Sequence, residues 1–464
     1  MNSSSPSPWH RVREEIVGGR QWLDRAVVLV YAIATGLIVV GFTLLAETAS
    51  TAFEWLTRSG TAGRWAPLVW TPALTVALLW LTRRFAAGAG GSGIPHVVAA
   101  LEFEMPEGAR SRFVSLSLSL KKIALVCGGL LAGLSIGREG PTVQVGAGIM
   151  QHARRWLSPR SSIDVHDLIV AGAAAGIAAA FNTPLGGIVF AIEQLSRRRS
   201  FTHSGLVIIS IVMAGLVAVS LLGNLTYFGE LRAQQPGWSL LAPALAVAVL
   251  SGLAGGVFAR LMIASFRALP DRFSRYRARH PFRFAAACGI AVAVIGIVSG
   301  QATAAAGYLP TRALLEGHAE LPALYTLLKF CATWLSAWAG VPGGVFAPSL
   351  AIGAGIGHDV AWIANISGDA AIALVAFGMV GFLSATTHGP LTAFIIVMEM
   401  VAGQSLVLSL MAVALVATGV SRLLTPPMFL ELAQLLAPRD GLAPTPPPTD
   451  GGPPSNASRA DTKA

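Results

Sequence analysis

A glutamate stands in the middle of an apolar stretch of this sequence. The segment GREGP at 137–141 interrupts the apolar run 123–150 and contains Glu139. A carboxylate at bilayer depth is costly to keep there and is usually functional. We therefore expect Glu139 to be the central functional residue. The alternative is that Glu139 only forms an ion pair with Arg138 or Lys122.

Three glycine-rich interruptions share one form. They are GSGIP at 91–95, GREGP at 137–141 and GGVFAP at 343–348. Glycines allow backbone conformations closed to other residues, and a proline then fits the first turn of a helix. Each interruption therefore predicts a helix that begins inside the membrane. The first N–H groups of a helix are unpaired and partly positive, so converging helix starts form an anion site.

Chloride suits such a site, because partial charges replace its hydration shell without the tight grip of a full cation. Ser92 adds a hydroxyl donor, although a serine between glycines is often only a turn residue. Ile94, Val345 and Phe346 supply backbone N–H groups, and their side chains exclude water.

Charged neighbours complete the predicted site. Lys122 and Arg138 would raise the local anion concentration by long-range attraction. Ionised Glu139 could occupy a chloride position and block the path, and protonated Glu139 could swing away. We expect a gate that responds to pH and to chloride.

The composition is that of a polytopic membrane protein. Hydrophobic residues make up 54% and charged residues 12%, against roughly 25% charged residues in soluble domains. Apolar runs near or above the roughly 20 residues that span a bilayer lie at 26–47, 66–82, 204–222, 238–266 and 284–300. Shorter runs, expected to be half-spanning or tilted helices, lie at 142–151, 168–182, 184–196, 346–357 and 389–402.

The net charge of +10 does not indicate nucleic-acid binding. The arginines cluster in short polar segments, at 11–25, 197–199 and 267–283, which is typical of cytoplasmic loops. We expect both termini in the cytoplasm, a first apolar run retained as a helix, and a disordered Pro-rich tail at 439–464 with no folded regulatory domain.

The sequence contains an internal repeat. Gly146-Ala147-Gly148-Ile149 recurs 207 residues later as Gly353-Ala354-Gly355-Ile356. Pro184-Leu185 with Glu193 recurs 206 residues later as Pro390-Leu391 with Glu399. Duplicated halves with interrupted helices indicate a transporter or channel with its site where the halves meet. Glu193 and Glu399 are expected to cap or brace the fold.

These motifs, with the helix sequence AAGIAAAFNTPLGGIVFAIE at 174–193, resemble those of the CLC chloride channels and chloride/proton exchangers over about residues 26–437. The resemblance implies an all-α polytopic membrane protein of two inverted-topology halves, about 26–224 and 237–437, in a domain spanning 26–438.

The resemblance also implies a homodimer with one anion pathway in each subunit, and it makes Ser92 the central anion ligand and Glu139 the gate. The implied chloride-binding positions are Ser92, Gly93, Ile94, Arg138, Gly140, Val345, Phe346 and Met428. Ser92, where nitrate-preferring members have proline, resembles the chloride-preferring members, and the intact motifs argue against the fluoride-exporting branch.

Three positions depart from the family pattern. Gln194 replaces the glutamate that relays protons from the cytoplasm, Met428 replaces the pore tyrosine, and His96 replaces a glutamate after GSGIP. Because glutamine cannot ionise, we expect passive anion conduction, with chloride/proton antiport as the alternative.

We therefore expect a chloride transport protein of a prokaryotic plasma membrane that crosses the bilayer several times. No enzyme activity, cofactor, metal or nucleic-acid partner is expected, and other small anions and protons are possible substrates. One rival is an intramembrane serine protease, because Gly90-Gly91-Ser92-Gly93 fits a G-x-S-G pattern. Another is a cation or solute transporter, for which more than one buried acid would be expected.

Overall fold

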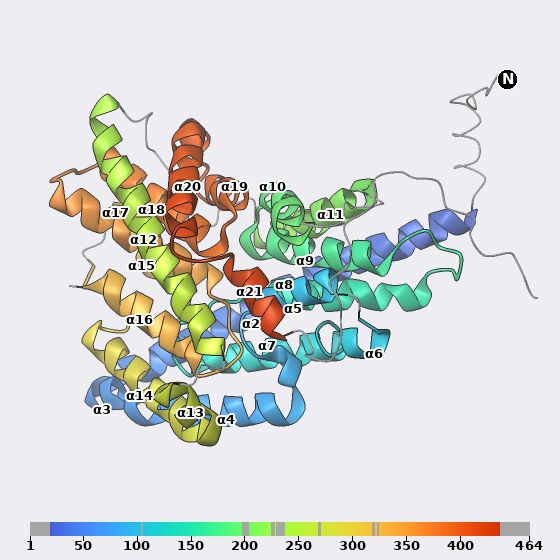
Figure 1. Cartoon of the computed structure of the whole chain (residues 1–464), viewed down its shortest axis with the longest axis horizontal. Helices are drawn as coiled ribbons and strands as arrows, with labels where there is room; N and C mark the ends of the chain where they lie inside the picture. The colour runs from blue at the N-terminus through green and yellow to red at the C-terminus, as the bar shows by residue number, and fades with distance from the viewer. Residues whose placement is uncertain are drawn as a thin grey trace, which may run out of the picture.

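The computed structural model describes residues 19–103, 105–196, 204–223, 228, 237–267, 271–317, 321–322 and 324–436. The arginines at 197–199 and the tail at 439–464 lie outside these residues. The described residues form helices joined by loops, and no β-sheet forms among them. They pack into one body in which α5 (Ile94–Glu102), α8 (Glu139–His152) and α21 (Met428–Leu436) lie near the middle (Figure 1).

Six helices of the described part are long and apolar enough to cross a bilayer. They are α2 (Gly19–Arg58), α11 (Ser204–Leu222), α12 (Leu241–Phe266, preceded by the 3-10 turn Trp238–Leu240), α14 (Pro281–Val298), α18 (Asp369–Thr387) and α20 (Val407–Arg422, preceded by the 3-10 turn Gln404–Leu406). The predicted runs at 204–222, 238–266 and 284–300 match helices, and α2 extends well beyond the predicted 26–47. The sequence did not predict α18 and α20, because threonine, serine and glycine interrupt their apolar pattern.

The remaining helices are shorter or more polar. They are α3 (Gly60–Trp65), α4 (Pro67–Phe85), α6 (Glu107–Arg110), α7 (Leu116–Leu131), α9 (Val165–Phe181), α10 (Pro184–Phe190), α13 (Arg272–Arg279), α15 (Tyr308–Leu315), α16 (Tyr325–Trp338), α17 (Phe346–Ile363) and α19 (Pro390–Met400). Short α8, α9, α10 and α19 confirm the predicted short helices, whereas α17 runs six residues past the predicted 357.

All three glycine-rich interruptions begin helices, as predicted. Helix α5 starts at Ile94 after Gly93, α8 starts at Glu139, and α17 starts at Phe346. A proline lies in the first turn of each. The first-turn N–H groups therefore have no partner within their own helix.

The repeat is visible in the packing of the two halves. A β-carbon at Gly146 of α8 would collide with the carbonyl oxygen of Gly172 in α9. In the second half, a β-carbon at Gly353 of α17 would collide with the carbonyl oxygen of Gly378 in α18. Both helix pairs therefore approach closely at equivalent glycines, which explains why this part of the repeat keeps them.

Two glutamates join the halves by reciprocal caps. The Glu193 carboxylate accepts the backbone N–H groups of Leu391 and Thr392 at 3.0 and 2.7 Å. The Glu399 carboxylate accepts those of Leu185 and Gly186 at 3.2 and 2.7 Å. Each acid thus neutralises the positive start of a helix in the other half. The predicted structural role of both glutamates agrees with these contacts.

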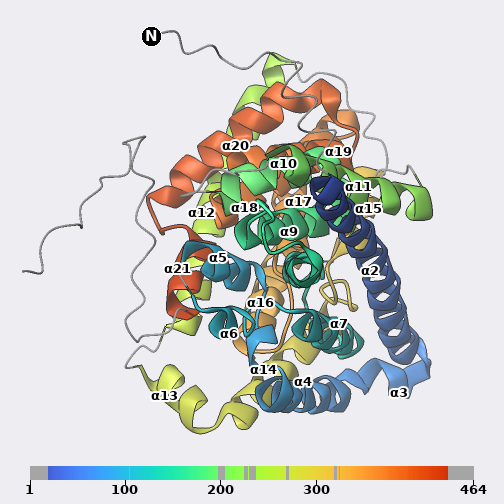
Figure 2. The ribbon, with the colours of Figure 1, turned by 90° about the vertical axis from the view of Figure 1, so that its right-hand side faces the viewer.

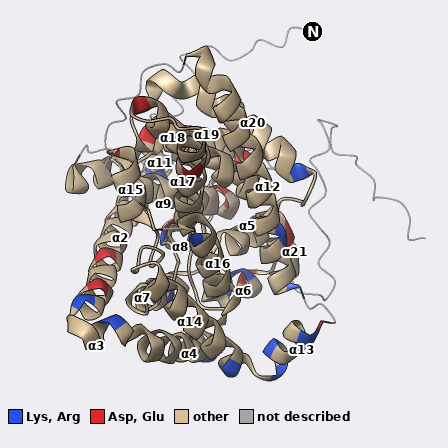
Figure 3. Ribbon diagram, turned by 90° about the vertical axis from the view of Figure 1, so that its left-hand side faces the viewer, with Lys and Arg blue, Asp and Glu red and all other residues tan. Residues whose placement is uncertain are grey.

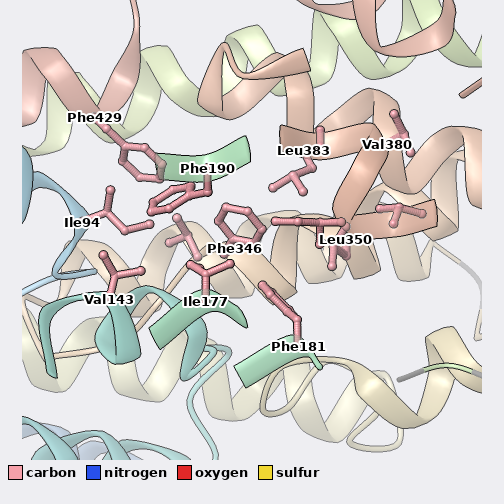
Figure 4. Close-up of a cluster of buried hydrophobic side chains, with 14 of the residues drawn as sticks. Ile94, Val143, Ile177, Phe181, Phe190, Phe346, Leu350, Val380, Leu383 and Phe429 are labelled. Atoms are coloured by element: carbon pink, nitrogen blue, oxygen red, sulfur yellow. The ribbon is translucent and has the colours of Figure 1, made fainter. Parts of the chain in front are cut away.

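The apolar core surrounds the start of α17. Figure 4 shows the Phe346 ring among side chains from both halves, with Phe190, Ile177 and Phe181 beside it. The rings of Phe346 and Phe181 have centroids 5.4 Å apart. Figure 3 shows charged residues mostly at the periphery, with a basic group on α13. The charged groups inside the body are therefore exceptions that need an explanation.

Candidate functional site

The starts of α8 and α17 are joined by two equivalent glycines. Gly137 N–H donates to the Gly344 carbonyl at 2.7 Å, and Gly344 N–H donates to the Gly137 carbonyl at 2.8 Å. The two positions are 207 residues apart, which is the offset of the repeat. The junction of the halves therefore passes between them, and the helix starts on either side lie close together.

The loop before α5 joins the same cluster. Gly343 N–H donates to the Gly91 carbonyl at 3.2 Å, which brings the loop of Ser92 against the loop of Val345. A β-carbon at Gly140 would collide with the Ser92 hydroxyl oxygen and would lie 3.4 Å from the Gly344 Cα. Only glycine at 140 therefore lets Ser92 approach the first turn of α8. The three predicted interruptions meet at one place.

Ser92 has an unused hydroxyl. Its Oγ is buried and makes no hydrogen bond to any described residue. A buried hydroxyl without a protein partner is costly unless a ligand or water satisfies it. The predicted role of Ser92 as an anion donor is consistent with this geometry. The protease alternative lacks its base, because no histidine of the described residues bonds to Ser92.

Gly93 and Gln144 shape the approach to α5. Gly93 has φ of +99°, a conformation that favours glycine, and Ile94 after it is fully buried. The Gln144 side-chain amide donates to the carbonyls of Gly88 and Phe113 at 2.9 and 2.7 Å. These two bonds satisfy the carbonyls of Gly88 and Phe113. The backbone amide of Ile94, the first residue of α5, is not involved in them.

The Glu139 side chain folds back between the starts of α8 and α17. It is fully buried, and neither carboxylate oxygen makes a hydrogen bond of normal geometry with the described residues. A β-carbon at Gly137 would collide with one of these oxygens and would lie 3.3 Å from the β-carbon of Ala347. The charge of the Arg138 guanidinium and the backbone amides of Glu139, Arg138 and Ala347 act on the carboxylate electrostatically. The carboxylate thus faces the partial positive charge that an anion would use.

Arg138 and Lys122 do not pair with Glu139. The Arg138 guanidinium donates to the Thr43 carbonyl at 3.3 Å and to the Glu47 carboxylate at 3.1 Å, both on α2. The Lys122 ammonium donates to the carbonyls of Ala89 and Gly91. In these contacts neither side chain forms an ion pair with Glu139, although the charge of Arg138 still acts on the carboxylate through space. The Arg138 side chain is directed to α2, so a chloride ligand at this position would have to be its backbone amide.

A cavity of about 340 Å³ reaches the Ser92 loop. Ser92, Val345 and Met428 line it together with three groups that the sequence reasoning did not assign to the site: Arg83, His96 and Arg277. Met428 begins α21, which lies beside α5 (Figure 2), and it presents a thioether instead of a hydroxyl to the cavity. The sequence signal for Arg83 is the Arg83-Arg84 pair at the end of an apolar run, and Arg277 belongs to the arginine-rich segment 267–283 that was interpreted only as a cytoplasmic loop.

Gln194 lies in a different part of the molecule. It is buried in the π-helical turn Ala191–Leu195 that follows α10. A β-carbon at Gly389 would collide with its side-chain nitrogen. The structure therefore places Gln194 at the junction with the start of α19, beside Glu193, and it is not among the residues that line the cavity at Ser92.

The helical body and its cluster of buried helix starts define a polytopic membrane protein whose two halves meet at three broken helices. Residues 73–422 match the family model of the voltage-gated chloride channels. The chain belongs to this family, that of the CLC proteins.

Characterised relatives carry more specific names. The chain is 32% identical over 399 residues to the H(+)/Cl(-) exchange transporter ClcA of Salmonella paratyphi A and of Salmonella typhi, with 80% of both chains covered. The ClcA protein of Salmonella arizonae is 31% identical over 400 residues, again with 80% of both chains covered. Each name describes that relative.

Solved structures confirm the fold class as that of an all-α polytopic membrane protein. A slow cyanobacterial Cl−/H+ antiporter superposes with a TM-score of 0.73 at 23% identity, covering 89% of this chain and 97% of that one. A CLC-type fluoride/proton antiporter superposes with a TM-score of 0.71 at 20% identity, covering 92% and 99%.

Proposed function

We propose that this chain carries chloride across the membrane through the cluster of helix starts around Ser92, with Glu139 as the gate. One observation carries the proposal: a buried carboxylate without a normal hydrogen bond lies between the starts of α8 and α17, where backbone N–H groups favour an anion. Ionised Glu139 fills this place, and chloride can enter when Glu139 is protonated and leaves it. The backbone amides are thus satisfied by the Glu139 carboxylate in one state and by chloride in the other.

Backbone amides suit a transported ion better than the buried side-chain cations do. The ammonium of Lys122 and the guanidinium of Arg138 are both held by protein acceptors. Chloride would therefore meet partial charges from Ile94, Gly140, Val345 and Phe346 and the hydroxyl of Ser92. Such contacts bind the ion and still allow it to leave.

The coupling to protons is proposed from the relatives. The names of the 31–32% identical relatives describe exchange of chloride for protons, and this favours the antiporter alternative over the passive channel. A proton taken up by Glu139 when it leaves the amides would couple the two fluxes. Passive conduction remains the second candidate function, favoured by Gln194, whose carboxamide cannot carry a proton.

The assembly and orientation are also proposals. We propose a homodimer that buries the exposed apolar side chains of α10, of the π-helical turn that follows it and of α19, which include Leu185, Ile192 and Leu391. We propose a multi-pass protein of a prokaryotic plasma membrane with both termini in the cytoplasm, on the side of the arginine-rich segments.

Proton coupling is tested with purified protein in liposomes that hold a chloride gradient and no proton gradient. An exchanger drives protons uphill as chloride runs down, and the external pH reports this movement. Glu139→Gln serves as the control that removes the titrating group. Uphill proton movement by the wild-type protein supports antiport. Robust chloride flux without it overturns antiport in favour of passive conduction, and we then expect Gln194→Glu to introduce coupling. Absence of chloride flux contradicts the proposed function as a whole.

A further inference from the structure

Lys122 is a buried cation that touches the loop of the anion site. It lies on α7, is fully buried, and its Nζ donates to the carbonyl oxygens of Ala89 and Gly91 at 2.6 and 2.7 Å. No carboxylate among the described residues pairs with it. A buried ammonium satisfied by carbonyls fixes the direction of those carbonyls, because releasing them would leave the charge unsatisfied.

The Gly91 carbonyl is held by two donors. Besides the Lys122 ammonium, it accepts the N–H of Gly343 at 3.2 Å. Gly91 has φ of +65° and immediately precedes Ser92. A carbonyl oxygen that turned toward a bound anion would repel it, whereas an N–H group would attract it. The direction of this one peptide group therefore decides whether the loop favours or opposes an anion.

We infer that Lys122 is a positioning residue of the anion site: it holds the carbonyls of Ala89 and Gly91 away from the ion, so that the Ser92 hydroxyl and the start of α5 face it. This inference rests on the proposed chloride site. It differs from a long-range electrostatic role, in which the Lys122 charge would act on the ion through space and independently of Ser92.

The second half of the chain offers a matched control. Lys329 follows Lys122 by 207 residues, is also fully buried, and donates to the carbonyls of Thr303 and Ala305 at 3.0 and 2.7 Å. Its loop leads to α15 and touches Leu134, and it does not include Ser92. Loss of Lys329 therefore removes the same kind of buried bond without releasing the peptide groups next to Ser92.

The test is a double-mutant cycle in chloride affinity, measured by isothermal titration on the purified full chain. The variants are Lys122→Met, Ser92→Ala, their combination, and Lys329→Met. Positioning predicts that Lys122→Met weakens chloride binding by about tenfold in the wild-type background and by less than about twofold when Ser92 is already alanine. Lys329→Met lowers the melting temperature comparably and changes the chloride affinity by less than about twofold.

Three outcomes separate the possibilities. Equal effects of Lys122→Met with and without Ser92 would assign Lys122 to long-range attraction and overturn the inference. Equal effects of Lys329→Met and Lys122→Met on affinity would make the effect a general loss of structure, which also overturns it. If Lys122→Met does not fold, the same cycle is run with Lys122→Gln, whose amide NH2 keeps two of the three N–H donors. Failure of the wild-type protein to bind chloride would instead refute the proposed function.

Discussion

The absence of a side chain at position 140 lets the Ser92 hydroxyl lie against the first turn of α8. Ser92 Oγ occupies the space that a β-carbon at Gly140 would need. The neighbouring Gly344 approaches the same place, where its own β-carbon would lie 3.1 Å from the Gly140 nitrogen. Steric exclusion at these two glycines therefore brings the hydroxyl and the amides together.

Gly140→Ala should separate these groups. The added methyl displaces Ser92, and overpacking of this kind costs roughly 1–3 kcal/mol. We expect chloride affinity to fall by about tenfold or more, since a factor of ten corresponds to about 1.4 kcal/mol. Isothermal titration measures it. The matched control is Gly41→Ala in α2, where nothing lies within 4 Å of the added carbon. Equal affinities for the Gly140→Ala and wild-type proteins would contradict the proposed contact of Ser92 with the anion.

The position of a single functional residue could be predicted from the sequence where that position depends on its neighbours in the chain. Glu139 lies in the first turn of a helix because glycines and a proline surround it, and this was evident from GREGP. The direction of the Arg138 side chain was not evident. It is set by Glu47, which precedes it by 91 residues and belongs to another helix. Long-range pairing of this kind leaves no local pattern.

At the scale of elements, two acids hold the halves together. Glu193 and Glu399 each accept two N–H groups at a helix start in the opposite half. These starts belong to α19 and α10, which begin with Pro390 and Pro184. The reciprocal arrangement fixes the rotation of one half relative to the other. Through that rotation it supports the site at the junction.

Glu193→Gln and Glu399→Gln should each lower the thermal stability of the protein. Each replacement exchanges a charged acceptor for a neutral one at two N–H groups, at a cost of roughly 1–3 kcal/mol. The apparent melting temperature in detergent measures the effect, and the two variants should behave alike because their contacts are equivalent. Glu316→Gln is the control, since Glu316 forms only an exposed ion pair with Arg312. A shift for Glu316→Gln as large as for the capping glutamates would contradict their structural role.

Helix starts could be predicted more reliably than helix lengths. Glycine and proline mark the starts of α5, α8 and α17, and these agree with the structure. Helices α18 and α20 were missed because serine, threonine and glycine interrupt their apolar pattern, although both are apolar enough over their full length to cross a membrane.

At the scale of the whole molecule, the proposed anion site belongs to neither half alone. Ser92 and Glu139 come from the first half, and Gly344, Phe346 and Met428 come from the second. The repeat predicted a site between halves, and the paired glycines at the junction agree with that prediction. The cavity beside this junction was not predictable, because Arg83 and Arg277 reach it from helices that are adjacent only after folding. The proposed path for chloride therefore depends on both halves being assembled.

The central claim is that the Glu139 carboxylate occupies an anion position at the starts of α8 and α17 and leaves it on protonation. Chloride efflux from liposomes, measured as a function of pH for the wild-type protein and for Glu139→Gln, tests this most directly. A carboxylate gains its proton as pH falls. The account therefore predicts that the chloride flux of the wild-type protein increases as the pH is lowered from about 8 to about 4. For Glu139→Gln it predicts a pH-independent flux at least as high as that of the wild-type protein at acidic pH. A Glu139→Gln protein that keeps the pH dependence of the wild type would contradict the account.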